Sequence, residues 1–223
     1  ESLTDRACLN VRDILAFSNC VRLEAVEPIL RPQIECNTAI AEKGLTGDYG
    51  ACVGKSLLRH FGPDVSNVAR ATAAAGSDAR MSGCQMPVII NSGSGNQGIT
   101  TSVPVIVYAR YHNLSDERLL RALCVSNLIA IHQKTNVGRL SAYCGAVSAA
   151  CGSGAAITYM LGGDYEQVSS TITNTLANVS GIICDGAKPS CAAKIASSVE
   201  AAIIGHTLAC ESVTFKDQRR RNH

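Results

Sequence analysis

Helix-length segments built largely from small residues dominate this sequence and constrain its fold more than any other feature. Apolar residues recur at helical spacing from the first segment onward, as Val11, Ile14 and Leu15 illustrate. Later segments are filled with alanine, glycine and serine, which let backbones approach closely, and no two segments read as a β-hairpin. The pattern predicts a mainly α protein: a single compact domain of roughly eight to ten helices, with a glycine-rich loop and at most short strands.

Proline, glycine and capping residues set the expected boundaries of these helices. Ser115 is expected to cap one of them, because acidic residues follow it in the first turn. A short apolar run at 81–90 is compatible with either a strand or a buried loop. The expected helical segments are 1–45 (punctuated by Pro28 and Pro32 and closed by Gly44 and Gly47), 50–60, 64–75 (ended by Gly76), 99–112 (interrupted by Pro104), 115–132, 145–160, 164–178 and 190–210. We assign residues 1–214 to one domain and residues 215–223 to a charged tail.

Composition excludes several classes of function. Aromatic residues make up 4% of the chain and tryptophan is absent, so platforms for stacking nucleic-acid bases are not expected. The run Arg219–Arg221 is short and terminal, and it reads as a solvated tail. No apolar run reaches the ~18 residues that span a membrane. Residues 1–5 lack the basic start and apolar stretch of a signal peptide, so we expect a cytoplasmic protein. They also lack a methionine, which suggests a start partway through a longer chain.

Eleven cysteines are present, and three of them stand apart from the rest. Most lie in alanine-rich helical segments, where a free cysteine behaves as a small buried apolar residue. Cys144, Cys184 and Cys191 instead lie beside glycines or at expected helix starts, which is where backbone N–H groups can stabilise thiolates. No CxxC pair occurs, which argues against zinc ribbons and ferredoxin-type sites. From spacing alone, both a packing role and a metal site remain open.

The most glycine-rich stretch, residues 91–99, has three interpretations. Its GxGxxG spacing fits a dinucleotide-binding loop, but the βαβ unit and the downstream acid that such a site needs are not evident. A cradle of backbone N–H groups for a carboxylate is a better mechanistic interpretation, and a tight turn between buried elements is the structural alternative. The candidate anion-binding residues are Ser92, Gly93, Ser94, Asn96, Gln97 and Gly98.

Taken together, several segments resemble the serine dehydratase-like α-chain family, and most closely its L-cysteine desulfidase branch. The resemblance covers nearly the whole chain except its tail. The segments that carry it are 33–42 with Gly50, Gly54 and Lys55, then 91–99, then 138–145, and finally 181–188 with 191–194.

The resemblance implies a [4Fe–4S] cluster held by three cysteines, with one iron left open. Cys144, Cys184 and Cys191 match the ligand positions at separations of 40 and 7 residues, and Cys151 competes with Cys144 for the first position. The implied reaction is an α,β-elimination that releases H2S from L-cysteine or water from L-serine, without pyridoxal phosphate. As a hypothesis, the Ser92–Gly98 loop grips the substrate carboxylate, while Lys188 or Lys134 contributes charge.

The resemblance also implies a partner within the same protein. By this resemblance, family members are about twice this length and the part absent here is the N-terminal half, which in the desulfidase branch supplies a catalytic cysteine. A homo-oligomer is compatible with the resemblance, whereas membranes and nucleic acids are not expected partners. Two alternatives to the lyase remain open: a helical scaffold that binds no cluster, and a zinc-binding module that uses the same cysteines.

Overall fold

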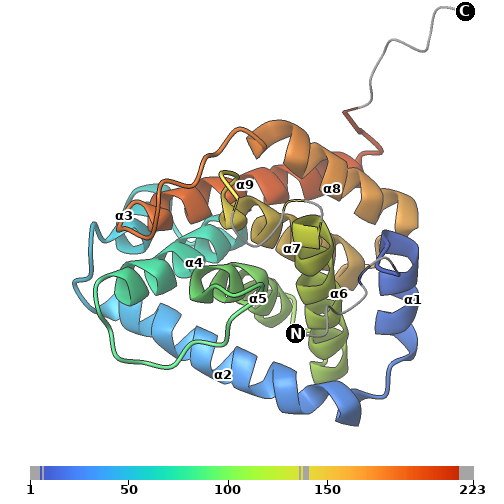
Figure 1. Cartoon of the computed structure of the whole chain (residues 1–223), viewed down its shortest axis with the longest axis horizontal. Coiled ribbons are helices and arrows are strands. Elements are labelled where there is room, and N and C mark those ends of the chain that lie inside the picture. Colours follow the sequence, from blue (N-terminus) through green and yellow to red (C-terminus); the bar gives the residue numbers. More distant parts are fainter. Residues whose placement is uncertain (1–5, 7, 136, 138–140, 216–223) are drawn as a thin grey trace, which may run out of the picture.

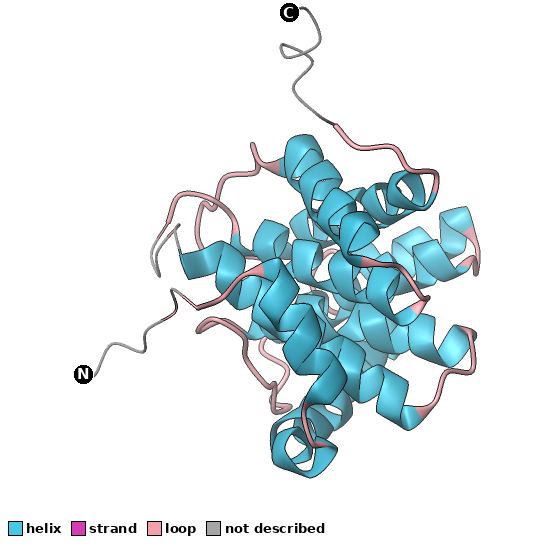
Figure 2. Ribbon diagram, turned by 90° about the vertical axis from the view of Figure 1, so that its right-hand side faces the viewer, coloured by secondary structure: helices cyan, strands magenta, loops and turns pink. Residues whose placement is uncertain are grey.

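The computed structural model describes residues 6, 8–135, 137 and 141–215. Within these ranges the protein is all-α, as predicted, and the bulk of the ribbon is helix joined by loops (Figures 1 and 2). The described residues form nine helices: α1 (Val11–Cys20), α2 (Leu23–Thr46), α3 (Val53–Phe61), α4 (Val65–Met81), α5 (Gly95–Tyr111), α6 (Asp116–Thr135), α7 (Gly145–Met160), α8 (Tyr165–Val179) and α9 (Cys191–Cys210).

Two helices, α5 and α7, form the centre of the molecule. Nearly every residue of α7 is buried, and α7 packs against α5, α6, α8 and α9. Around this centre, α2 and α4 pack together on one side, while α1 covers α6 at the edge (Figure 1). A helix that is buried on all faces must be apolar or small on all faces, and the alanine-rich sequence of α7 meets that demand.

Close helix contacts depend on glycine at several crossings. A Cβ atom at Gly44 would lie 1.9 Å from the carbonyl oxygen of Ala75, where α2 crosses α4. Gly152 of α7 similarly faces the carbonyl oxygen of Ser126 in α6, at 2.4 Å from an added Cβ. These distances are far below van der Waals contact, so no larger residue fits without moving a helix.

Several predicted boundaries are confirmed. The helices over 145–160, 164–178 and 190–210 are present within a residue or two of their expected ends. The hydroxyl of Ser115 accepts a hydrogen bond from the N–H of Arg118 (3.2 Å), as expected of a cap for α6. The segment 84–90 is a loop, and no strand occurs among the described residues; only two isolated bridges, Asn91–Ser94 and Tyr143–Ile183, are found there.

Other boundaries were predicted wrongly. Pro28 and Pro32 do not break their helix: α2 continues through both, and Gly44 lies inside it. Gly76 does not end α4, which continues to Met81, because this glycine faces the side chain of Ile99 and serves packing. At Gly44 and Gly76 a tertiary contact outweighs the local tendency of glycine to end a helix.

No helix among the described residues combines the length and the apolar character needed to cross a membrane. The predicted tail lies outside the described residues apart from Phe215.

We predict that Gly44→Ala destabilises the protein by about 3 kcal/mol, because the new Cβ meets the Ala75 carbonyl. Thermal unfolding should show a midpoint roughly 6–12 °C lower for a chain of this size. Gly181→Ala is the matched control, since an added Cβ there meets nothing within 4 Å. Equal melting temperatures for the two variants would contradict the tight α2–α4 crossing.

A buried carboxylate should make stability depend on pH. Asp78 is 1% exposed, and one of its oxygens accepts the N–H of Gly54 (3.1 Å) at the start of α3. Burial raises the pKa of Asp78 above its ordinary value of 3.8, and hydrogen bonds from Gly54 and Val53 oppose that rise. The folded state therefore holds this proton more tightly than the unfolded state.

The stability that this proton contributes is complete below the unfolded pKa and is lost as pH rises through the raised folded pKa. Asp78→Asn cannot ionise, so the variant should gain stability relative to wild type as pH rises from below 3.8 towards neutrality. Urea unfolding of both proteins across this range measures the difference. A difference that does not change with pH would show that Asp78 titrates normally.

Candidate functional site

The three singled-out cysteines come together where α7 and α9 begin. Cys144 is the N-cap residue of α7, and Cys191 is the first residue of α9. Cys184 lies in the loop between α8 and α9, and a short backbone pairing ties it to Cys144. The N–H of Cys144 donates to the carbonyl of Ile182 (3.0 Å), and the N–H of Cys184 donates to the carbonyl of Ala142 (2.7 Å). The fold thus joins segments that are 40 residues apart in sequence.

The thiols are close enough to influence one another. Burial raises the pKa of Cys144, while the backbone N–H of Ala146 lowers it and the neighbouring thiols of Cys184 and Cys191 raise it. Two helix N-termini lie at this place, and their partial positive charge favours thiolates over thiols. The three cysteines are therefore placed to carry negative charge once a bound cation balances it.

An ion-pair clamp fixes the loop that carries Cys184. The carboxylate of Asp185 pairs with Lys188 (2.9 Å) and with Lys194 of α9, and Lys194 also donates to the carbonyl of Ile183 (2.9 Å). The two ammonium groups, Lys194 first, hold the pKa of Asp185 far below its usual range. Lys188, a candidate for supplying charge, is therefore already engaged with a carboxylate at the surface.

Among the described residues, no three His, Cys, Asp or Glu side chains form a ready-made metal geometry. Cys184 is exposed, and the Sγ of Cys191 lies 3.8 Å from the carbonyl oxygen of Gly186. The donor set still fits an iron–sulfur cluster in its chemistry: three thiols sit on a loop and two helix starts, within electrostatic reach of one another.

The competing ligand, Cys151, lies in a different place. It is fully buried in the middle of α7, with its Sγ 4.0 Å from the carbonyl oxygen of Ile172. Burial raises the pKa of this thiol to about 12. A group that resists ionisation in the core is a poor ligand, so the structure favours Cys144 for the first position.

The glycine-rich stretch is only partly a loop. The prediction of a loop throughout 91–99 was wrong, because α5 begins at Gly95 and includes Asn96, Gln97 and Gly98. Ser94 caps the helix by accepting the N–H of Gln97 (3.5 Å). Its predecessors Ser92 and Gly93 form the turn, both with positive φ.

Two of the candidate anion-binding residues have structural roles in the turn and at the helix start. An added Cβ at Gly98 would lie 1.9 Å from the carbonyl oxygen of Ile89, so this glycine permits a close contact. The Ser92 hydroxyl donates to the side chain of Asn91 (2.9 Å). The N–H groups of Gly95 and Asn96 have no hydrogen-bond acceptor in the described part of the chain, as is usual in a first helical turn.

Gln97 joins this helix start to the cysteine cluster. Its side-chain amide lies against Gly145, next to Cys144, where an added Cβ would be 2.5 Å from Nε2. Gln97 is 9% exposed, and its Oε1 has no hydrogen-bond partner within the described ranges. A buried amide oxygen without a partner is costly in a purely structural role, which marks it as a candidate contact for a ligand.

Lys134, the second candidate for supplying charge, is buried near the end of α6. The helices α6 and α7 are antiparallel, since Arg118 donates to the carbonyls of Tyr159 and Met160 (3.0 Å each) at the far end of α7. The end of α6 therefore lies alongside the first turn of α7, which Cys144 caps. Lys134 makes no side-chain hydrogen bond or ion pair with any described residue.

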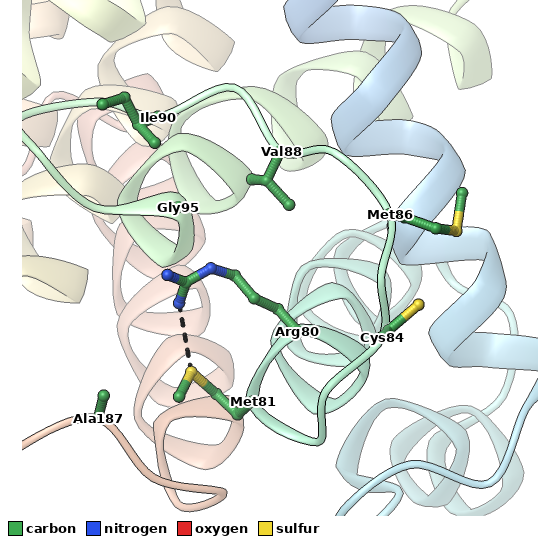
Figure 3. Close-up of a pocket in the computed structure, with 8 residues that line it drawn as sticks. All are labelled: Arg80, Met81, Cys84, Met86, Val88, Ile90, Gly95 and Ala187. Atoms are coloured by element: carbon green, nitrogen blue, oxygen red, sulfur yellow. Dashed lines mark hydrogen bonds between the residues drawn. The ribbon is translucent and has the colours of Figure 1, made fainter.

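A cavity of about 400 Å³ lies between the glycine-rich turn and the cysteine-bearing loop (Figure 3). The guanidinium of Arg80, in the last turn of α4, points towards Gly95 at the start of α5. Sequence reasoning missed Arg80, because a basic residue in the last turn of a helix is common and carries no functional signal of its own. The lining residues are Arg80, Met81, Cys84, Met86, Val88, Ile90, Gly95 and Ala187.

Side-chain amides hold the loop over this cavity. Asn37 of α2 donates to the carbonyl of Ile89 (3.1 Å) and accepts its N–H (2.9 Å). Asn91 donates to the side chain of Asn127 in α6 (2.9 Å), which in turn donates to Gln33 (2.8 Å). The cavity wall is therefore fixed by the two helices beneath it.

Comparison with known proteins identifies relatives over nearly the whole chain. The family model of the serine dehydratase alpha chain matches residues 10–220. A UPF0597 protein of Lachnoclostridium phytofermentans is 59% identical over 215 residues, which cover 96% of this chain and 52% of the relative. A UPF0597 protein of Desulfitobacterium hafniense is 57% identical over 96% of this chain and 50% of its own length.

A third relative, a UPF0597 protein of Treponema denticola, is 57% identical over 96% of this chain and 51% of its own length. This chain thus spans about half the length of the curated relatives that it matches. No solved structure matches it.

We predict that the cysteines differ sharply in reactivity. Iodoacetamide at about pH 8 should modify the exposed Cys184 faster than the partly buried Cys144. Cys151 should react at least ~100-fold more slowly than Cys184, because burial both shields it and suppresses its thiolate. Peptide mass spectrometry over time gives the rates, with Cys124, whose pKa burial raises to about 11, as a second core thiol. Comparable rates at Cys151 and Cys184 would contradict these placements.

Proposed function

Because this chain belongs to the serine dehydratase alpha chain family, we propose that it forms the cluster-binding part of a lyase. The proposed lyase eliminates H2S or water from a small β-substituted amino acid, L-cysteine or L-serine. The observation that carries the proposal is the meeting of Cys144, Cys184 and Cys191 at the starts of α7 and α9.

In this proposal the three thiolates hold a [4Fe–4S] cluster. The chemistry that such a cluster supplies when bound through three cysteines is Lewis acidity at its remaining iron, directed at a thiol or hydroxyl leaving group. Two helix N-termini and the ammonium group of Lys194 offset the negative charge of the thiolates.

The residues of the chain then perform the positioning and the charge control. The Asp185 clamp keeps the Cys184 loop against the start of α9. Gln97 sets the start of α5 beside Cys144, and Lys134 places a positive charge on the buried side of the site. The Gln97 oxygen is available to a substrate, since it has no hydrogen-bond partner among the described residues.

The proposed reaction breaks the Cα–H bond and the bond from Cβ to sulfur or oxygen. The α-proton goes to a base, and the electron pair of that bond forms the Cα–Cβ double bond as the β-substituent leaves. The resulting 2-aminoacrylate hydrolyses to pyruvate and ammonia. We assign the base to the other half of the full-length protein, because this chain spans about half the length of its curated relatives.

We predict about four irons per chain after anaerobic reconstitution with iron and sulfide. Cys144→Ala, Cys184→Ala and Cys191→Ala should each lose most of that iron together with the visible absorbance of the cluster. Iron and sulfide assays on each purified variant measure this loss.

Cys151→Ala is the matched control for the iron experiment, because Cys151 is a core thiol of the same helix that Cys144 caps. It should load iron as wild type does. Loss of iron in Cys151→Ala but not in Cys144→Ala would reverse the ligand assignment. Zinc bound in place of iron would support a zinc-binding module, and no bound metal would support a helical scaffold.

A further inference from the structure

Arg80 lacks a carboxylate partner in the described part of the chain, as does Arg118, whose guanidinium donates to the backbone carbonyls of Tyr159 and Met160 instead. Arg31, Arg70 and Arg121 each pair with at least one acidic side chain. The hydrogen bonds of the Arg80 guanidinium go instead to the Oδ1 of Asn96 (3.2 Å) and to the sulfur of Met81. A permanently charged group is thus held in a cavity with neutral partners only.

The helix beside Arg80 adds to the same positive field. A Cβ atom added at Gly95 would lie 2.4 Å from the Nε of Arg80. Glycine at this position therefore lets the guanidinium lie against the first turn of α5. The N–H groups of Gly95 and Asn96 have no acceptor within the described ranges. A planar guanidinium beside free helical N–H groups is a favourable arrangement for a carboxylate.

The cavity has the size and the orientation for a small amino acid. Its volume of about 400 Å³ falls at the lower end of the ~300–1,000 Å³ range of small-molecule sites. The side chain of Val88 points towards Arg80, whereas those of Cys84 and Met86 point away from it (Figure 3). On the opposite side the wall includes Ala187, which lies in the loop between Cys184 and Cys191. The cavity therefore borders the loop that joins Cys184 to Cys191.

We propose that Arg80, together with the first turn of α5, binds the α-carboxylate of the amino-acid substrate. This assignment rests on the proposed function for the identity of the ligand. It moves the anion-binding role away from Ser92 and Ser94, whose hydroxyls serve the turn and the helix cap. Apart from Arg80 the residues that line the cavity are uncharged, so a second charged group on the substrate would have no counter-charge there, which favours an uncharged substrate side chain.

Titration calorimetry with L-serine and with L-serinamide, which lacks the carboxylate, tests the assignment on the full chain after reconstitution. Arg80→Gln should weaken L-serine binding by about 10- to 100-fold, the range expected for a charge-assisted pair. L-Serinamide should bind weakly, and equally to both proteins. Arg80→Lys should recover part of the affinity, because it restores the charge but not the paired N–H groups.

Two further variants separate this role from a structural one. Gly95→Ala retains the arginine but displaces its guanidinium, so it should weaken L-serine binding as Arg80→Gln does. Arg110→Gln, an exposed arginine at the other end of α5, should bind L-serine as wild type does. Melting temperatures of the variants show whether each is folded.

The outcomes distinguish the two proposals. L-Serine binding that depends on Arg80 in a chain that loads no iron would support the carboxylate site and overturn the proposal of an iron–sulfur cluster. Normal iron loading with L-serine affinity unchanged in Arg80→Gln would overturn the carboxylate site alone. Absence of L-serine binding to wild type, or equal losses for L-serine and L-serinamide in Arg80→Gln, would also overturn it.

Discussion

Backbone-to-backbone packing around α7 is the constraint on which the site depends. Gly154 of α7 lies so close to α9 that an added Cβ would be 2.9 Å from the Cβ of Ala202 and 3.1 Å from its carbonyl oxygen. The same helix approaches α6 at Gly152. Because these crossings permit little sliding, they fix where α7 and α9 begin, and two of the three candidate ligands are at those beginnings.

Charge follows from this packing. Three helix starts, those of α5, α7 and α9, lie around the glycine-rich turn and the cysteine cluster, and each contributes partial positive charge. Arg80, Lys134 and Lys194 add full charges, while the carboxylate of Asp185 pairs with Lys188 of the loop and with Lys194 of α9. A site with this excess of positive charge is suited to thiolates and to a substrate carboxylate, and unsuited to a bare cation held by carboxylates.

The sequence predicted the helices well and the tertiary contacts poorly. The small and apolar residues of α7 and α9 were sufficient to predict these helices. In α7, burial on all faces requires such residues at every position, and this is readable from the sequence alone. Gly76, Gly95 and Gly98 were interpreted as helix breaks or loop residues. They are glycines because Ile99 lies against Gly76, Arg80 against Gly95 and Ile89 against Gly98. That reason is invisible until the partner helix or loop is placed.

The candidate site shows the same division. Helix starts and glycines singled out Cys144, Cys184 and Cys191, but spacing alone did not separate ligands from packing thiols. The resemblance to a family supplied the choice, and the pairing of Cys144 with Ile182 and of Cys184 with Ala142 gives it a physical basis. Arg80 gave no signal, since its role depends on a contact with Asn96 that is not local in sequence.

The central claim is a cluster that is held by three cysteines and leaves one iron open to substrate. Mössbauer spectroscopy of the chain reconstituted with iron-57 tests this claim most directly. The account predicts a three-to-one pattern of iron sites, in which only the single site changes when L-cysteine or L-serine is added. Four equivalent iron sites that do not respond to either amino acid would contradict it.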